Sequence, residues 1–305
     1  MEIKCRFCRN TDHLSHGYRK NKSGKKRVYK CLSCGKTFSH NDGFLKMRFD
    51  KKFIGKCIYL FINGMSVRKI VNYMKDNEGI EVSHATILRW KSKYGGMLKE
   101  YENSMVMNYD EECTINSDET MIKVNGNFHY LWGSINKETK YLLSLILSDG
   151  RGMKDAIRMF SECKSKMKND PKYVVTDGFG VYPRAFKKAY FKYSPPRAYH
   201  VVSAGIKDRG ENNPIERFFG HVKDRTRTTR GGFDNMNSAT DFMNLFSVFY
   251  NQIRPHMSLN GRTPAQAAGI DLNLKDNKLL DLIERSADWH GDHINKENEA
   301  SQKYQ

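Results

Sequence analysis

The spacing of apolar residues divides the chain into three parts. Before about residue 45, large apolar side chains are few, and Lys, Arg, Gly and Ser are common. Between residues 50 and 94, apolar side chains recur at the interval of a buried helix face. From residue 113, short apolar runs bounded by turn residues predict strands, with periodic helical stretches between the later runs. The pattern therefore indicates a multidomain protein.

Turn and capping residues separate three short helices in the middle part. Asn63 and Gly64 end the first helix, Ser66 caps the second, and a turn containing Gly79 leads to a third that begins at Ser83. This pattern predicts a helix-turn-helix in which residues 83–89 enter the major groove of DNA. An ordinary helical bundle explains the same pattern about equally well.

The third part predicts a mixed five-stranded sheet covered by helices, as in the ribonuclease H-like fold. A strand meander comes first, and helices and strands then alternate. In order, we expect strands over residues 113–118, 121–124, 127–135 and 141–147, a helix over 153–166, a strand over 172–176, a helix over 182–190, a strand over 198–202, and then helices.

Composition and charge narrow the class of protein. A chain of 305 residues with 39% apolar residues can bury the cores of two or three domains, which excludes a disordered protein. Residues 1–100 hold 23 Lys and Arg against 8 Asp and Glu, which is +15 of the total charge of +18. Such a concentration is typical of a surface that binds nucleic-acid phosphates, and a merely solubilising surface is the weaker alternative.

The cysteines and the longest apolar stretch indicate the cellular compartment. The sequence has no N-terminal signal pattern, and the apolar stretch 141–147 is far too short to cross a bilayer. We therefore expect a cytoplasmic, nucleoid-associated protein without membrane contact. Seven cysteines, an odd number, favour reduced thiols over disulfides in such a chain.

Four of the cysteines form two Cys-x-x-Cys knuckles, Cys5 with Cys8 and Cys31 with Cys34. Two knuckles supply the closed four-thiolate shell of one structural Zn²⁺ ion. His13 or His16 could replace a ligand, which we consider the weaker interpretation. A segment of about 40 residues with few large apolar groups needs such a metal to fold. The sequence therefore predicts a small β zinc ribbon with a basic hairpin between the knuckles.

Three acidic residues are the candidates for catalysis: Asp118 in CTINSDET, Asp177 in KYVVTDGFG and Glu216 in NNPIERFFGHVK. The first two are expected at strand ends, and the third follows Pro214 in the first turn of a helix. Carboxylates placed in this way can converge on two divalent cations roughly 4 Å apart, as in-line attack on a phosphodiester requires. Lys223 lies two helical turns after Glu216 and so shares its face.

Each acid also has a simpler interpretation. Asp177 could be a turn residue before a glycine, and Glu216 could only complement the helix dipole. Glu119 is adjacent to Asp118, but strand alternation directs only one of the two inward. Asp149 in LILSDGRG also follows an apolar run and is a rival for the second position, although its glycine-rich exit favours a loop.

Several segments together resemble a known family. SDETMIKVNGNFHYLWGSIN, VVTDGFGVYP, NNPIERFFGHVK and YNQIRPHMSLNGRTPAQAAGI are similar to the DDE transposases of bacterial and archaeal insertion sequences, most of all to the insertion-sequence-six group. The similarity covers most of residues 108–270, and some members share the zinc ribbon and helix-turn-helix. The 38 residues between Asp177 and Glu216 are a few more than the group's usual spacing.

The resemblance implies a mechanism, cofactors and partners. It makes Asp118, Asp177 and Glu216 the ligands of two Mg²⁺ or Mn²⁺ ions and Lys223 a basic catalytic residue, and it sets Asp149 aside. The partners would be double-stranded DNA, both element ends and target, and further copies of the chain in a homodimer or higher oligomer. The residues expected to contact DNA are Arg19, Lys20, Lys25, Lys26, Arg27, Ser83, His84, Thr86, Arg89, Arg225, Arg227 and Arg230.

The expected organisation has five segments. These are a zinc ribbon (1–44), a helix-turn-helix domain (45–100), an acidic linker (101–107), a ribonuclease H-like catalytic domain (108–270), and a C-terminal helix with a flexible tail (271–305). The main alternative to a transposase is a DNA-binding regulator descended from one, without catalytic activity. A structure-specific nuclease would explain the acids but not the separate N-terminal region.

Overall fold

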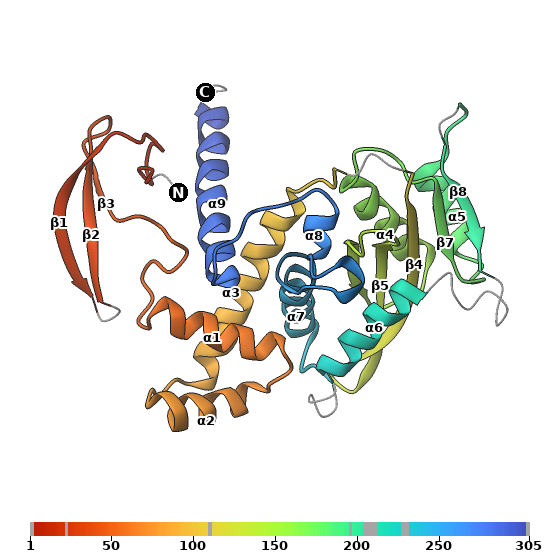
Figure 1. The fold of residues 1–305 in the computed structure, drawn as a ribbon, viewed down its shortest axis with the longest axis horizontal. Coiled ribbons are helices and arrows are strands. Elements are labelled where there is room, and N and C mark those ends of the chain that lie inside the picture. The colour runs from red at the N-terminus through yellow and green to blue at the C-terminus, as the bar shows by residue number, and fades with distance from the viewer. Residues whose placement is uncertain are drawn as a thin grey trace.

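The chain extends from a small N-terminal sheet through a helical centre to an α/β part (Figure 1). The computed structural model describes residues 3–21, 24–108, 112–194, 197–203, 213–226 and 232–302. Within these residues, no helix is both long enough and apolar enough to span a membrane.

The N-terminal sheet has three antiparallel strands, β1 (His13–Asn21), β2 (Gly24–Cys31) and β3 (Thr37–Phe38). Its core is small, with Tyr29 and Phe38 packed beside two buried cysteines. The His13 ring packs edge-on against Tyr29 at 4.7 Å, and its Nδ1 lies 2.5 Å from the carbonyl oxygen of Thr11. His13 is therefore part of this core and not of the cysteine cluster.

The helical centre begins with α1 (Lys51–Ile62), α2 (Val67–Glu78) and α3 (His84–Asn103). The side chains of Asp50, Ser66 and Ser83 accept hydrogen bonds from the first-turn backbone N–H groups, as capping residues do. Gly79 ends α2 in the left-handed conformation, at φ 63°. The third helix is much longer than the sequence predicted, because it packs along α7 (Met236–Val248) and α9 (Lys278–Gln302).

The central sheet has the order β6-β5-β4-β7-β8. Its strands are β4 (Thr114–Val124), β5 (Asn127–Asn136), β6 (Leu142–Ser148), β7 (Tyr173–Thr176) and β8 (Tyr199–Val202). The first three pair antiparallel, whereas β7 and β8 run parallel to β4. This mixed five-stranded arrangement confirms the expected ribonuclease H-like core.

One detail of the predicted strands is wrong. The sequence suggested two strands, over residues 113–118 and 121–124, but β4 is continuous through both. Its pairing with β5 is unbroken from Ile115 opposite Asn136 to Val124 opposite Asn127. Asp118 therefore lies in the middle of a long strand, opposite Gly133, and not at a strand end.

Helices cover both faces of the sheet. On one face, α4 (Met153–Ser165) and α5 (Tyr182–Tyr190) pack around Trp132 and Phe160. On the other face, α6 (Asn213–Thr226) and α7 contribute to an apolar core that continues into α1, α2 and α3. The helical centre and the sheet thus share one core.

A buried polar contact also joins these two parts. Asn251, in the π-helical turn η2 (Phe249–Ile253), donates a hydrogen bond to Glu102 of α3 at 2.9 Å. The same side chain accepts from the backbone N–H of Leu142 and donates to its carbonyl oxygen. Lys99 pairs with Glu102 at 3.1 Å, so the buried carboxylate is neutralised. These contacts connect α3 to strand β6.

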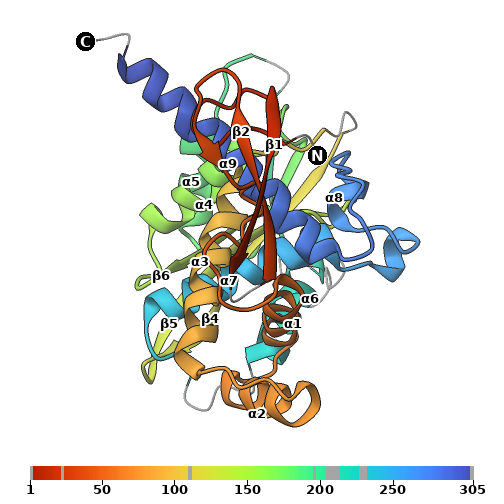
Figure 2. The ribbon, with the colours of Figure 1, turned by 90° about the vertical axis from the view of Figure 1, so that its left-hand side faces the viewer.

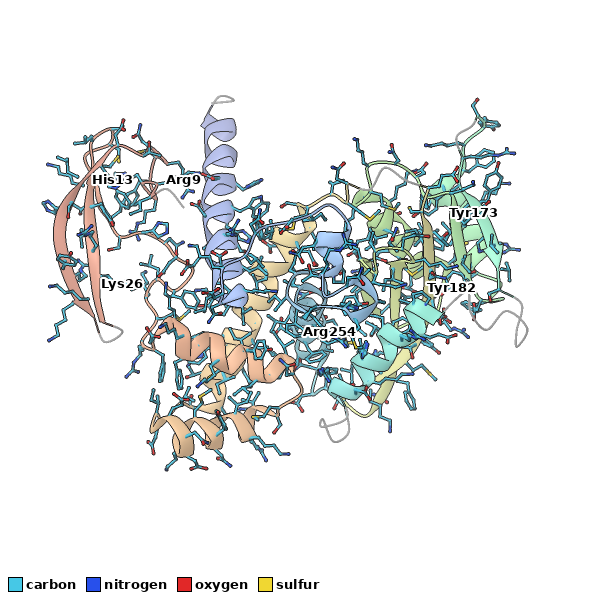
Figure 3. The ribbon with its side chains drawn as sticks, viewed as in Figure 1. Arg9, His13, Lys26, Tyr173, Tyr182 and Arg254 are labelled. Carbon is cyan, nitrogen blue, oxygen red and sulfur yellow. The ribbon has the colours of Figure 1, made fainter. Side chains whose placement is uncertain are left out.

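The C-terminal helix connects the helical centre to the N-terminal sheet. The short helices η3 (Met257–Leu259) and α8 (Pro264–Ala267) precede it, and α9 then extends to Gln302, far into the segment where the sequence predicted a flexible tail. Figure 2 shows α9 crossing behind β1 and β2, and Figure 3 shows Arg9 beside it. Arg9 Nη2 lies 2.6 Å from Asp288 Oδ1, and Arg9 Nε lies 2.7 Å from Asp292 Oδ1.

Candidate active site and metal centres

Asp118 and Asp177 lie beside each other because of the register of two parallel strands. The last paired residues of β4 and β7 are Asn116 and Val175. Asp118 and Asp177 each follow two positions later, so the same register brings them together. One carboxylate oxygen from each of Asp118, Glu119 and Asp177 lies within 4.8 Å of the other two. The sheet therefore gathers carboxylates at the point where β4 and β7 diverge.

Burial and negative charge make Asp118 difficult to ionise. Burial raises the pKa of Asp118 from 3.8 to about 7. The backbone N–H of Glu119, which donates to Asp118 Oδ1 at 2.8 Å, opposes this rise, whereas the charges of Glu119, Asp177 and Glu216 add to it. A cation bound between the carboxylates would remove most of the repulsion. Such an unfavourable arrangement of charge is typical of functional sites.

Glu216 approaches Asp118 from α6, and a glycine permits this approach. Gly133 is the β5 residue opposite Asp118. A Cβ atom at Gly133 would lie 3.0 Å from Ile215 Cδ1 and 3.3 Å from ring atoms of Phe219, both on α6. The missing side chain thus lets α6 pack closely on the sheet beside Asp118. A glycine within a strand can mark such a close approach, but the sequence gives no indication of which helix approaches.

Glu216 and Lys223 are both exposed on α6, as expected for residues two turns apart. Glu216 is near enough to raise the pKa of Asp118, whose burial is the main cause. It does not belong to the close group of three carboxylates found among the described residues. The structure therefore brings Asp118 and Asp177 together and places Glu216 and Lys223 on the helix that faces them.

Glu119 is the member of the close group that the sequence analysis set aside, because strand alternation directs only one of Asp118 and Glu119 inward. It accepts a hydrogen bond from Arg151 Nε at 2.6 Å and another from the Tyr182 hydroxyl. The position of Tyr182, at the start of α5, is visible in Figure 3. These partners lie 32 and 63 positions away, so no local pattern could have revealed them.

Asp149, the rival for the second position, lies apart from this group. Its carboxylate is 3.0 Å from His129 Nδ1, and its side chain is 83% exposed. Asp149 is not among the clustered carboxylates of the described residues. Its position therefore agrees with a loop residue and leaves Asp177 as the acid beside Asp118.

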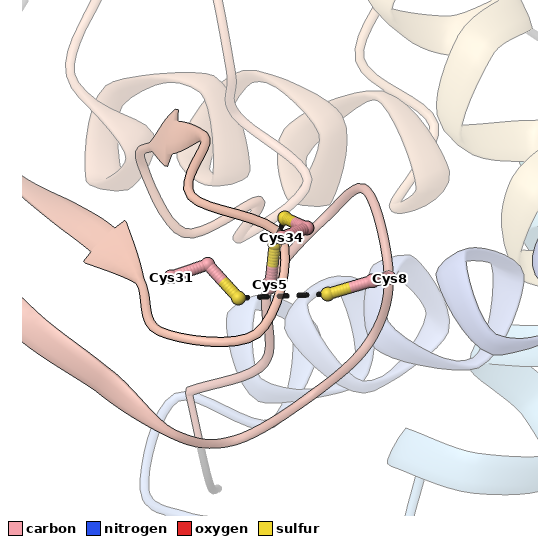
Figure 4. A group of neighbouring side chains, drawn as sticks. All are labelled: Cys5, Cys8, Cys31 and Cys34. Carbon is pink, nitrogen blue, oxygen red and sulfur yellow. Dashed lines mark hydrogen bonds between the residues drawn. The ribbon is translucent and has the colours of Figure 1, made fainter.

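The four N-terminal cysteines form a compact cluster (Figure 4). Their sulfur atoms all lie within 4.8 Å, with 3.7 Å between Cys5 and Cys34 and 3.5 Å between Cys8 and Cys31. Thiolates about 2.3 Å from a tetrahedral zinc ion are about 3.8 Å apart, so the cluster fits Zn²⁺. All four cysteines are free thiols, and the backbone N–H of Cys34 lowers the pKa of Cys31 to about 6. The cluster is therefore compatible with a zinc ribbon.

The residues expected to contact DNA are mostly accessible. Arg19, Lys20, Lys25 and Arg27 are exposed on the β1–β2 hairpin, whereas Lys26 is half-buried, 3.7 Å from Asp42. At the start of α3, Ser83, His84 and Arg89 are exposed and Thr86 is half-buried. Arg225 is half-buried at the end of α6, and Arg227 and Arg230 lie outside the described residues.

A comparison with protein families supports the resemblance inferred from the sequence. Residues 113–256 match the family model DDE_Tnp_IS240, which is described as a DDE domain. The matched segment begins just before β4 and includes all five strands of the sheet as well as α6. The α/β part of the chain is therefore a transposase-type DDE domain. No curated protein matches the chain.

Distant structural similarities exist to retroviral proteins. The catalytic core domain of HTLV-2 integrase in complex with magnesium, in its dimeric form, shares 14% identity at a TM-score of 0.39 and covers 54% of this chain and 97% of that one. The trimeric form of the same domain shares 13% identity at a TM-score of 0.37 and covers 53% of this chain and 97% of that one. A simian T-cell lymphotropic virus intasome in complex with PP2A regulatory subunit B56 gamma shares 10% identity at a TM-score of 0.36. It covers 70% of this chain and 67% of that one. The order of the sheet, and not these distant similarities, identifies the core.

Proposed function

We propose that this protein is a DDE transposase that binds the terminal inverted repeats of an insertion sequence and catalyses metal-dependent DNA strand cleavage and strand transfer. The observation that carries the proposal is the placement of Asp118 and Asp177 side by side by the β4–β7 register, with Glu216 opposite them on α6. A site built only for stability would not collect carboxylates whose charges repel one another.

The residues divide the chemical work between them. Asp118, Asp177 and Glu216 would hold two Mg²⁺ or Mn²⁺ ions, because hard cations prefer carboxylate oxygens. Bound there, the metal ions would supply an activated oxygen nucleophile and stabilise the leaving oxygen of an in-line displacement. Lys223 presents its ammonium group from the same helix as Glu216, where it would bind a phosphate of the scissile strand. The 3′ hydroxyl released by cleavage would then attack target DNA.

The N-terminal region would bind the ends of the element. On the β1–β2 hairpin, Arg19 lies opposite Lys26, and Lys20 lies opposite Lys25. Like charges directly opposite each other destabilise a sheet, so their placement is better explained by an anionic partner. DNA phosphates are such a partner, and contacts with them would position the protein on the duplex.

The exposed start of α3 would read the sequence of the repeat. Ser83, His84 and Arg89 are accessible there, and Arg89 donates to the hydroxyl of Thr86 at 3.2 Å. Helix α2 and the turn at Gly79 precede it, as in a helix-turn-helix. Two ends must be joined, and the described residues of one chain contain a single cluster of carboxylates, so we expect a homodimer or higher oligomer to act on DNA.

Substitution of one carboxylate tests the proposal. The substrate is a labelled duplex with the inverted repeat found in the DNA that flanks the gene. We expect Asp177→Asn to abolish Mg²⁺-dependent cleavage while binding of the duplex, measured by gel shift, stays nearly unchanged. Asp149→Asn, at an exposed carboxylate outside the site, is the matched control and should cleave normally.

Three results would contradict the proposal. Full cleavage by Asp177→Asn would show that the site lies elsewhere. Normal binding of the repeat with no cleavage by the unaltered protein would instead identify a DNA-binding regulator. Cleavage without preference for the repeat would favour a nuclease.

A further inference from the structure

Four side chains next to the pair of aspartates contact one another on the α5 side of the sheet. Glu119, Arg151, Phe179 and Tyr182 come from β4, from the loop after β6, from the loop after β7 and from α5. We refer to these four residues as the Glu119 clamp. In the sequence only Glu119 was considered, as a rival of Asp118, and the acids assigned to metal binding leave the role of all four residues unexplained.

Glu119 and Asp118 belong to opposite faces of the sheet. Ile115 and Glu119 are separated by an even number of positions on β4, and Ile115 packs in the core beneath α4 and α5. Ile122, an even number of positions from Asp118, packs in the core shared with α6 and α7. Asp118 thus shares its face with α6, which carries Glu216, whereas Glu119 shares its face with α5.

Both carboxylate oxygens of Glu119 already have partners. Arg151 donates to Oε1, with its Nε at 2.6 Å, and the Tyr182 hydroxyl donates to Oε2. The side chain of Glu119 is only 4% exposed. Burial raises the pKa of Tyr182 well above its usual range, so its hydroxyl keeps the proton that it donates. The negative charge of Glu119 is therefore neutralised by Arg151, and both of its oxygen atoms already accept hydrogen bonds from protein groups.

The same two partners hold the loop that carries Asp177. The guanidinium carbon of Arg151 lies 3.9 Å from the centre of the Phe179 ring, and the Tyr182 ring meets Phe179 edge-on at 5.9 Å. The backbone N–H of Phe179 donates to Asp177 Oδ1 at 2.9 Å. A chain of contacts thus leads from Glu119, the neighbour of Asp118, through Arg151 and Phe179 to Asp177.

We propose that the Glu119 clamp is a positioning device that fixes Asp177 relative to Asp118, and that Glu119 is a positioning residue and not a further metal ligand beside Asp118, Asp177 and Glu216. The inference rests on the proposed function, which assigns the metal ions to Asp118, Asp177 and Glu216. β4 and β7 stop pairing two residues before the aspartates, so backbone hydrogen bonds alone do not hold this distance. The clamp connects the strands where the sheet does not.

Substitutions that keep the charge of the Glu119 clamp distinguish whether Glu119 positions the aspartates or binds the metal itself. Arg151→Lys keeps the positive charge but loses the planar guanidinium group, which donates hydrogen bonds to Glu119 and stacks on the Phe179 ring. Phe179→Leu removes the ring without changing any charge. Arg158→Lys, at an exposed arginine of α4, is the matched control. The probe is Mn²⁺ alone, titrated calorimetrically into the full-length protein, with thermal melting in EDTA to verify folding.

We expect Arg151→Lys and Phe179→Leu to weaken Mn²⁺ binding by about 10- to 100-fold, as the loss of residues that orient metal ligands does. Arg158→Lys should bind Mn²⁺ like the unaltered protein. Glu119→Gln should weaken binding less than Asp118→Asn does. The double variant Glu119→Gln/Arg151→Lys should bind Mn²⁺ about as weakly as the weaker-binding of the two single variants, because both substitutions disrupt the same contact.

Opposite results would follow if Glu119 were itself a ligand. Arg151→Lys would then leave Mn²⁺ affinity unchanged or increase it, because the carboxylate would be released from a competing partner. Glu119→Gln would cost as much affinity as Asp118→Asn. Either result overturns the clamp while leaving the proposed function intact, whereas absence of Mn²⁺ binding by the unaltered protein overturns both.

Discussion

Replacement of Asp118 by asparagine should stabilise the metal-free protein. The folded state raises the pKa of Asp118 from 3.8 to about 7, mainly through burial. The folded protein therefore binds this proton more tightly than the unfolded chain, and its stability falls as pH rises from about 4 to 7. Asp118→Asn removes the charge but keeps an oxygen that can accept from the backbone N–H of Glu119.

The magnitude follows from the size of the pKa shift. A rise of about 3 units corresponds to roughly 4 kcal/mol, which is the cost of ionising Asp118 in the folded protein above pH 7. Between pH 5 and pH 8, the unaltered protein should lose about 3 kcal/mol that Asp118→Asn does not lose. For a domain of this size, that difference is roughly 6 to 12 °C in melting temperature.

The assay is thermal melting in EDTA at pH 5 and pH 8. Asp118→Asn should melt higher than the unaltered protein at pH 8, and the gap should narrow at pH 5. Excess Mg²⁺ should raise the melting temperature of the unaltered protein and leave the variant almost unchanged. Asp149→Asn, at an 83% exposed carboxylate, should show neither effect. If the melting temperature of Asp118→Asn at pH 8 in EDTA is equal to or lower than that of the unaltered protein, then ionised Asp118 does not destabilise the metal-free fold and the reasoning is wrong.

Three further predictions concern other parts of the chain. Gly133→Ala places a methyl group 3.0 Å from Ile215, so we expect the free energy of unfolding to fall by about 1–3 kcal/mol and DNA cleavage to weaken. Gly220→Ala, whose Cβ would meet nothing within 4 Å, is the control. Equal cleavage by the two variants would contradict the reasoning. Cys31→Ser, or removal of zinc by a chelator, should unfold the N-terminal sheet and weaken DNA binding in a gel shift; an affinity indifferent to both would refute the zinc assignment. Arg9→Ala breaks the ion pairs with α9 and should weaken docking of the N-terminal sheet by about 1.5–3 kcal/mol. Limited proteolysis of residues 39–50 measures this, and an unchanged rate would show that the contact contributes nothing.

The sequence predicted that Asp118 and Asp177 could converge because it placed both at strand ends; in the structure the register of the parallel strands β4 and β7 brings them together, although Asp118 lies within β4. It also predicted the cysteine cluster, since ligand spacing is a local property. It placed a strand break after Asp118, where polar residues interrupt the apolar pattern. Those residues instead continue β4, because pairing with β5 satisfies their backbone groups.

The parts that the sequence did not predict depend on distant partners. Glu119 acquires its role only through Arg151 and Tyr182, from a loop and a helix that fold against β4. The length of α9 is similarly unexpected, because its acidic residues are matched by Arg9 and Lys4 at the other end of the chain. Local periodicity contains no information about such contacts.

The ion pair between Arg9 and Asp292 also has a consequence for biosynthesis. The two residues are 283 positions apart. At about 5–20 residues per second, the ribosome makes Asp292 roughly 15 s to 1 min after Arg9. The cysteine cluster can bind its metal early, but the N-terminal sheet cannot reach its final position until α9 has been synthesised. A nascent chain therefore carries an undocked N-terminal sheet until the part of α9 that contains Asp288 and Asp292 has been made.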